Sequence, residues 1–94
     1  MSRTAIKQKS QQRDSRRSAI LVKLGDRIRT LRRTRGMTQE ALAEALDLSV
    51  AYVSLIERGG RNPPYTTVAL IAGALSVPLA ELCKDDLPAA GPTR

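Results

Sequence analysis

The segment that most constrains the fold of this chain is 37–59, which divides into two short helical patterns. Thr38 precedes the first pattern and Ser49 the second, and each hydroxyl can accept a hydrogen bond from the free N–H groups of a first helical turn. Apolar residues recur at helical spacing in both patterns, and the turn between them is tight. Gly59 and Gly60 then end the second pattern, because glycine adopts the left-handed conformation past a helix without steric cost. The arrangement is typical of a helix-turn-helix unit.

Helical patterns also flank this unit. Apolar spacing predicts a first helix over about 18–35, ended by Gly36, and further helices over about 65–75 and 79–83. The 94 residues include two tyrosines but no tryptophan or phenylalanine, so we expect an aliphatic core. A chain of this length suffices for one domain. The sequence therefore predicts an all-α domain of five helices over 18–84, followed by a disordered tail over 85–94.

The positive charge is concentrated near the N-terminus. Of the net charge of +7, residues 1–18 carry +5, from six basic residues and one acidic residue. Because residues 1–17 are polar and almost free of apolar side chains, we expect a flexible basic arm that follows phosphates or enters the minor groove of DNA. A solvated terminus without a role is the alternative. A backward continuation of the first helix is also open, because good helix formers fill this segment.

Several kinds of protein are excluded by composition. The single cysteine, Cys83, cannot form an intramolecular disulfide, and without histidine the chain has no metal-ligand spacing and no imidazole base. We therefore expect no cofactor and no enzymatic activity. Cys83 lies in an apolar pattern, which favours packing in the core. The longest apolar run near the start, 19–22, is too short for a signal peptide, so we expect a cytoplasmic protein that does not enter a membrane.

Five fragments in matching order resemble the DNA-binding domain of the phage-repressor family, which is Cro-like and lambda-repressor-like and is also called XRE-type. The resemblance covers about residues 20–83. The fragments are Leu24-Gly25-Asp26-Arg27-Ile28-Arg29-Thr30-Leu31-Arg32, Thr38-Gln39-Glu40-Ala41-Leu42-Ala43, Ile56-Glu57-Arg58-Gly59, Arg61-Asn62-Pro63 and Ala74-Leu75-Ser76-Val77-Pro78. The fold that this resemblance implies is a compact five-helix lambda-repressor-like helix-turn-helix domain, which usually binds double-stranded DNA as a two-fold dimer.

The resemblance also implies roles for three residues of the helical framework. Gln39 resembles the glutamine that grips a phosphate and braces the recognition helix, a role that suits an amide at a helix N-terminus. A solvated surface glutamine is the alternative. Arg32 and Glu57 resemble the internal ion pair of the family, and we expect them to stabilise the fold without contacting DNA.

Specificity is expected in the helix that follows Ser49. If Val53 and Ile56 face the core, helical spacing places five side chains on or near the opposite side: Val50, Ala51, Ser54, Leu55 and Arg58. Apolar groups there cannot form bidentate hydrogen bonds with base edges and would contact thymine methyl groups. Four further side chains are expected at the DNA backbone: Ser49, Tyr52, Arg61 and Asn62. Arg35 is expected to add positive potential around the helix. An ordinary amphipathic surface helix remains the alternative.

Three positions depart from the family pattern. Asp47 and Ser76 stand where the family often has glycine, so we expect a left-handed backbone there with a small loss of stability. Leu70 stands where a polar residue is usual. Together with Ala74 it indicates either a patch that a partner covers or a single exposed leucine.

The sequence thus predicts a sequence-specific DNA-binding regulator, most simply a repressor that occupies a palindromic operator as a homodimer. Two alternatives remain open. One is an antitoxin-like module that binds a toxin partner and for which DNA binding is secondary; the apolar groove side and Leu70 favour it, whereas the basic arm opposes it. The other is a controller protein of a restriction-modification system, which differs only in its target gene.

Overall fold

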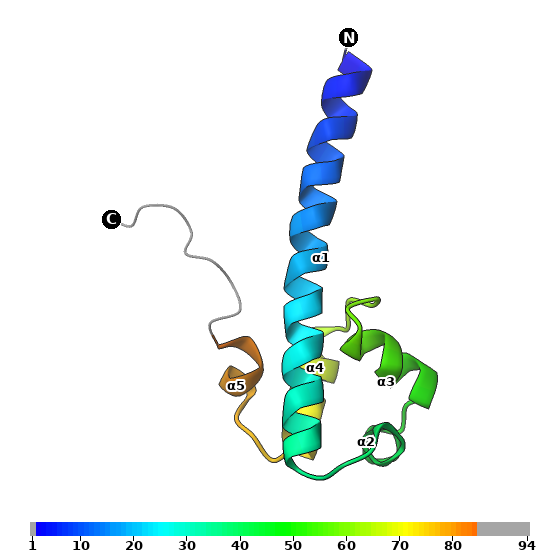
Figure 1. The fold of residues 1–94 in the computed structure, drawn as a ribbon, viewed down its shortest axis with the longest axis vertical. Coiled ribbons are helices and arrows are strands. Elements are labelled where there is room, and N and C mark those ends of the chain that lie inside the picture. Colours follow the sequence, from blue (N-terminus) through cyan, green and yellow to red (C-terminus); the bar gives the residue numbers. More distant parts are fainter. Residues whose placement is uncertain (1, 85–94) are drawn as a thin grey trace, which may run out of the picture.

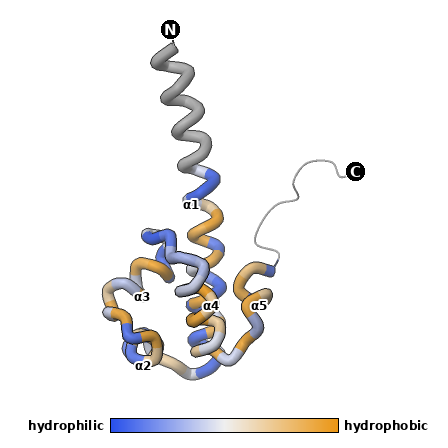
Figure 2. The backbone as a smooth tube through the Cα atoms, turned by 180° about the vertical axis from the view of Figure 1, so that it is seen from behind, coloured by the Kyte–Doolittle hydropathy of each residue, from blue (hydrophilic) through white to orange (hydrophobic). Residues whose placement is uncertain are grey.

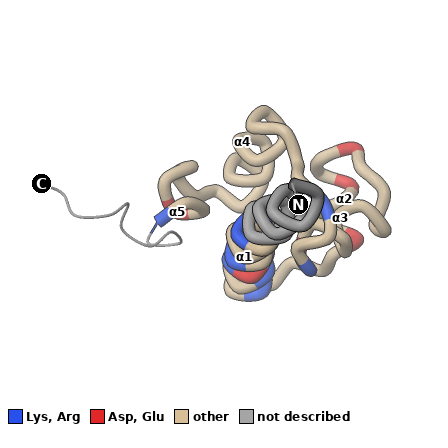
Figure 3. The backbone as a smooth tube through the Cα atoms, turned by 90° about the horizontal axis from the view of Figure 1, so that it is seen from above, with Lys and Arg blue, Asp and Glu red and all other residues tan. Residues whose placement is uncertain are grey.

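The computed structural model describes the backbone of residues 2–84 and the side chains of residues 15–84. This part of the chain is all-α, as predicted, and its helices are α1 (Ser2–Thr34), α2 (Gln39–Leu46), α3 (Val50–Glu57), α4 (Tyr65–Ala74) and α5 (Leu79–Cys83). Figure 1 shows α1 as a long central rod with α2 and α3 on one side, α5 on the other, and α4 behind. The view along α1 agrees: α4 lies between α5 and the α2–α3 pair (Figure 3).

The first helix begins much earlier than position 18. It is continuous from Ser2 to Thr34, so the backward helical continuation is the form that the N-terminal segment takes. The reason is composition, because no proline or glycine occurs before Gly25 and the intervening residues are mostly good helix formers. The N-terminal part of α1 projects beyond the other four helices (Figure 1). The tail expected over 85–94 lies outside the described residues.

Local chemistry sets the ends of the two central helices. The Thr38 hydroxyl accepts a hydrogen bond from the backbone N–H of Ala41, and the Ser49 hydroxyl accepts one from the N–H of Tyr52, both at 3.0 Å. The turn between α2 and α3 passes through Asp47, which adopts the left-handed conformation with φ of 56°. Ser76 does the same after α4, with φ of 58°. Both left-handed positions were expected, and the caps lie where the hydroxyl residues predicted them.

The core lies where α2, α3, α4 and α5 meet the C-terminal half of α1. All of its members are aliphatic, as the composition indicated: Ile28, Leu42, Ala43, Val53, Ile56, Val68, Ile71, Ala72, Leu75 and Leu82. In Figure 2, α4, α5 and much of α3 are coloured as apolar, while the loop after α3 is hydrophilic. Four short helices therefore share one core, in which α1 packs mainly against α3 and α5, and α2 and α4 pack against each other.

Cys83 does not pack in the core. It is exposed, because α5 is only five residues long and its neighbour Leu82 takes the inward position, with none of its surface exposed. The expectation of a core cysteine was therefore wrong. Within the described part of the chain, no helix is both long enough and apolar enough to cross a membrane.

Candidate nucleic-acid interface

Helix α3 has one side fixed in the protein and one side open. Val53, Ile56 and Glu57 each expose only 2% of their surface. On the other side Val50, Ala51 and Arg58 are exposed. An eight-residue helix with this division presents a short outward edge of small and apolar groups, with a guanidinium at its C-terminal end.

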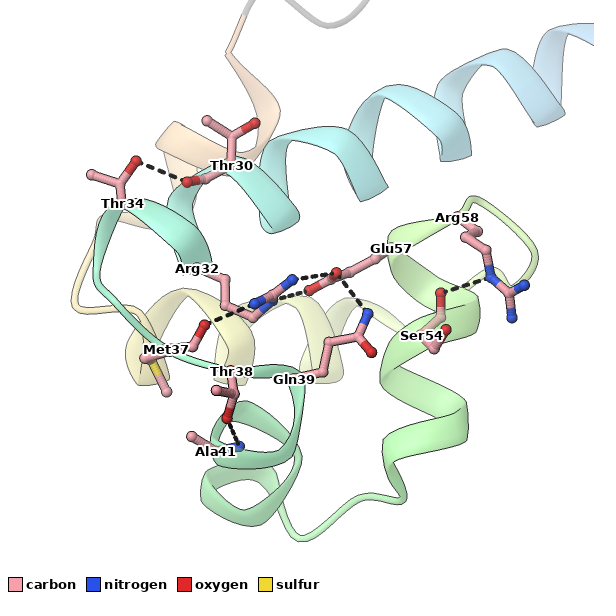
Figure 4. A network of polar contacts seen from close by, with 10 residues as sticks. All are labelled: Thr30, Arg32, Thr34, Met37, Thr38, Gln39, Ala41, Ser54, Glu57 and Arg58. Carbon is pink, nitrogen blue, oxygen red and sulfur yellow. Dashed lines mark hydrogen bonds and ion pairs between the residues drawn. The ribbon is translucent and has the colours of Figure 1, made fainter.

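The inward side of α3 is held by an ion pair that crosses the domain (Figure 4). Arg32 Nε donates to Glu57 Oε2 at 2.6 Å, and Arg32 Nη2 donates to Glu57 Oε1 at 3.1 Å. A third nitrogen, Nη1, donates to the backbone oxygen of Met37 at 2.7 Å. The hydrogen bonds to Glu57 raise the pKa of the Arg32 guanidinium and its negative charge acts in the same direction, although burial opposes both. Arg32 therefore remains charged, and α1 is tied to the end of α3.

Gln39 joins the same carboxylate. Its Nε2 donates to Glu57 Oε1 at 3.0 Å, so Glu57 accepts hydrogen bonds from α1 and from the first residue of α2. The side chain of Gln39 thus joins the start of α2 to the C-terminal end of α3 (Figure 4). An amide nitrogen carries two protons, and Glu57 accepts only one of them here. The second proton is available at a helix end whose own N–H groups favour an anion.

The backbones of α1 and α3 approach each other closely at Gly25. A Cβ atom placed on this buried glycine would lie 2.4 Å from the Glu57 carbonyl oxygen and 2.5 Å from that of Ile56. One turn earlier, Val22 backbone atoms lie against Gly59, whose φ is +78°. The C-terminal end of α3 is therefore fixed by backbone packing as well as by the ion pair, which leaves its outward edge in a defined orientation.

The loop after α3 adds exposed polar and basic groups beside that edge. Arg58, Arg61 and Asn62 are all exposed, and the two arginines make only long contacts to nearby carbonyl oxygens, 3.4 Å to Ser54 O and 3.4 Å to Gly60 O. Helix α4 then begins at Tyr65, and its N-cap residue, Pro64, provides no side-chain cap. The first N–H groups of α4 are therefore open at an end that favours an anion, and Arg61 lies in the loop that leads to them.

Other residues expected at the interface are placed differently. Ser54 and Leu55 are half-buried, and Tyr52 is partly buried against the core. Ser49 is exposed and keeps its own hydroxyl proton while it caps α3. Arg35 extends toward the α4–α5 turn, where its Nη2 donates to the Ser76 carbonyl oxygen at 2.9 Å. The structure thus does not bring Arg35 together with the outward edge of α3.

Two features of this region were missed by the sequence reasoning. One is the hydrogen bond from Gln39 to Glu57, which joins α2 to the ion pair. The other is the uncapped start of α4, for which Pro63-Pro64 gave a signal, since a proline N-cap has no side chain that can accept from the helix N–H groups.

The two crossed helices, the tight turn and the open edge of α3 define a helix-turn-helix domain. Residues 28–82, more than half of the chain, match the helix-turn-helix family HTH_3. The chain belongs to this family.

Three known proteins show the extent of the similarity. The immunity repressor of Bacillus phage phi105 is 36% identical over 63 residues, which are 67% of this chain but 44% of the repressor. The uncharacterised transcriptional regulator YazB of Bacillus subtilis is 41% identical over 58 residues, 62% of this chain and 84% of YazB. Among solved structures, the restriction-modification controller protein C.AhdI of Aeromonas hydrophila is 42% identical with a TM-score of 0.64, over 66% of this chain and 94% of the controller. The chain is a DNA-binding transcriptional regulator of the helix-turn-helix type.

Proposed function

We propose that the chain is a repressor that binds an inverted-repeat operator as a homodimer, with one α3 in the major groove of each half-site. The observation that carries this proposal is the division of α3, whose inner side is pinned through Glu57 while Val50, Ala51 and Arg58 lie open. The similarity to a phage immunity repressor supports the sign of regulation. Since its relatives include bacterial regulators, we place its action in the cytoplasm.

The roles of the side chains follow from their chemistry. Val50 and Ala51 are apolar and exposed, so they fit thymine methyl groups in the major groove, and the Ser54 hydroxyl can donate to or accept from a base edge. Gln39 donates its second amide proton to a phosphate while the first stays on Glu57. Arg58, Arg61 and the basic N-terminal segment supply the positive potential that draws the duplex in.

Two further contacts are proposed for the DNA backbone. The exposed Ser49 hydroxyl and Asn62 amide can each donate to a phosphate oxygen. Tyr52 and Leu55, which are partly buried, would contact DNA only with the edges of their side chains. Arg35 contributes positive potential at a distance, since its guanidinium is held by Ser76.

The test is a selection of bound duplexes from a random pool at two salt concentrations. We expect an enriched inverted repeat that contains A·T pairs where Val50 and Ala51 contact it. Affinity should fall steeply with salt while the preferred sequence stays the same. Equal binding to every duplex would refute sequence-specific regulation and leave a non-specific basic protein.

Variants then separate phosphate contacts from base contacts. Gln39→Ala should weaken binding to all duplexes by a similar factor, whereas Ser54→Ala should change which duplex is preferred. The reverse pattern would show that the two roles are exchanged. Arg61→Ala should reduce the slope of log affinity against log salt by about 0.9, the value for one lost phosphate contact. Lys84→Ala, which removes a positive charge from the end of α5 on the side away from α3, is the matched control and should leave the slope unchanged.

A second candidate, control of a restriction-modification system, is favoured by the similarity to C.AhdI, of which 94% is covered. It uses the same interface and differs in the target gene. The position of the selected inverted repeat in the genome decides between them, because a controller binds next to the genes of a restriction endonuclease and its methyltransferase.

A further inference from the structure

The outward face of α4 is unusually apolar for a surface. Leu70 exposes 63% of its surface on this face. Beside it, a shallow hollow of about 340 Å³ lies between α4 and α2, lined by small or apolar residues: Ala45, Leu46, Ala69, Leu70, Gly73 and Ala74. We call this the α4 face. The sequence indicated it through Leu70 and Ala74, which suggested either a patch that a partner covers or a single exposed leucine.

The α4 face carries no charge. Helix α4 contains no Lys, Arg, Asp or Glu, although 27% of the whole chain is charged. A surface without cationic groups cannot neutralise phosphates, so the α4 face does not belong to the DNA interface. It is instead the kind of surface on which two chains that each carry +7 can meet without strong repulsion.

Gly73 is a second, independent sign of close contact on this face. A Cβ atom placed on it would meet nothing within 4 Å, so packing inside the domain does not require a glycine. Glycine in a helix is less favourable than alanine by up to about 1 kcal/mol. The absence of a side chain is useful where another surface approaches the helix backbone.

We propose that the α4 face is the surface through which two copies of this chain associate. Leu70 and the hollow at Gly73 lie three residues apart, hence on one side of the same helix. A two-fold arrangement therefore seats Leu70 of each copy in the hollow of the other, which satisfies the requirement that such an interface be self-complementary. The proposal rests on the dimer of the proposed function and names its surface.

The position of α4 suits this role. In the view along α1, α4 lies between α5 and the α2–α3 pair (Figure 3). A copy docked on the α4 face therefore leaves the outward edge of α3 uncovered in both chains. A second apolar groove lies between α1, α4 and α5 and is lined by Ile20, Leu24 and Tyr65 among others.

The small size of the face sets the strength of the contact. Helix α4 has ten residues and is roughly 15 Å long, so the buried area falls below the roughly 800 Å² per partner of a standard interface. The dimer without DNA should accordingly be weak, with a dissociation constant above the micromolar range. Two adjacent half-sites on DNA raise the effective concentration of the copies and complete the pairing, so binding to an inverted repeat should be cooperative.

The experiment measures self-association and DNA binding separately. Sedimentation equilibrium of the full chain, from micromolar to millimolar, is compared for the wild type, Leu70→Gln, Gly73→Ala and Ile20→Gln. Both α4 variants should raise the dimer dissociation constant at least tenfold. Ile20→Gln makes the same kind of change on the second groove, where the side chain is 43% exposed, and should leave the constant unchanged. Thermal unfolding of each variant at low concentration checks that the monomer is intact, and Gly73→Ala should raise the midpoint.

DNA binding supplies the second readout. On a duplex with one half-site, Leu70→Gln should bind with the affinity of the wild type. On the full inverted repeat its affinity should be at least tenfold lower. A wild type that stays monomeric at millimolar concentration and binds the repeat without cooperativity would overturn the proposal. So would a dimer that dissociates with Ile20→Gln and not with Leu70→Gln. Failure of the proposed function looks different: no duplex would be preferred, whatever the state of association.

Discussion

Replacement of Arg32 by methionine tests how much the domain depends on its buried ion pair. Glu57 exposes 2% of its surface and accepts two hydrogen bonds from Arg32 and one from Gln39. In Arg32→Met the carboxylate keeps only the Gln39 amide, and Met37 O loses its donor as well. Breaking a buried pair by removing one partner costs about 3–5 kcal/mol. A domain of this size has a free energy of unfolding of about 4–12 kcal/mol, so this variant should be close to unfolding.

The assay is urea unfolding followed by far-ultraviolet circular dichroism, with the double variant Arg32→Met/Glu57→Met as the decisive comparison. With a slope of about 1 kcal/mol per molar urea, the single change should lower the midpoint by about 3 M or abolish the transition. The double variant leaves no unpaired charge, so most of the lost free energy should return. A single variant that loses less than about 1 kcal/mol would contradict the reasoning. So would a double variant less stable than Arg32→Met.

Three other changes test the framework of the domain by the same urea titrations. Gly25→Ala should cost more than about 2 kcal/mol, because its Cβ would lie 2.4 Å from a backbone carbonyl oxygen of α3; a neutral result would mean that α1 and α3 are less closely packed. Ser76→Gly should add about 0.5–1 kcal/mol, since φ is 58° there, and a loss would place the strain elsewhere. Thr38→Ala should cost about 1 kcal/mol through the lost cap of α2, and Thr38→Ser, which keeps the hydroxyl, should cost much less.

The parts of the fold that the sequence predicted are those that depend on neighbouring residues. Thr38 and Ser49 cap their helices because a hydroxyl before a helical pattern meets the N–H groups of the next turn, whatever the rest of the fold does. The left-handed turns at Asp47 and Ser76 were expected from the resemblance, because the family often has glycine at these two positions, and both residues have positive φ. Local rules of this kind were enough to predict the order of the helices, whereas the family came from the resemblance of five fragments in matching order.

Contacts between distant segments were not predictable in this way. Gln39 was expected to brace α3, but only the packed domain shows that its partner is the carboxylate of Glu57. Cys83 has the apolar neighbours of a core residue and is exposed, because the register of α5 against α1 decides which side faces inward. Arg35 has the charge expected near DNA, yet its guanidinium lies on the Ser76 carbonyl. In each case the outcome depends on how helices pack, which a pattern along one helix does not record.

On α3 the side that is held by the domain is separate from the side that we propose to contact DNA. Glu57 and the backbone contact at Gly25 hold the helix from inside, while Val50 and Ala51 carry no part of the core and are exposed. Substitutions at these two positions therefore alter the surface offered to a duplex at little cost to folding. If the open edge contacts the duplex as we propose, the apolar residues now present there are one choice among many that the same framework supports.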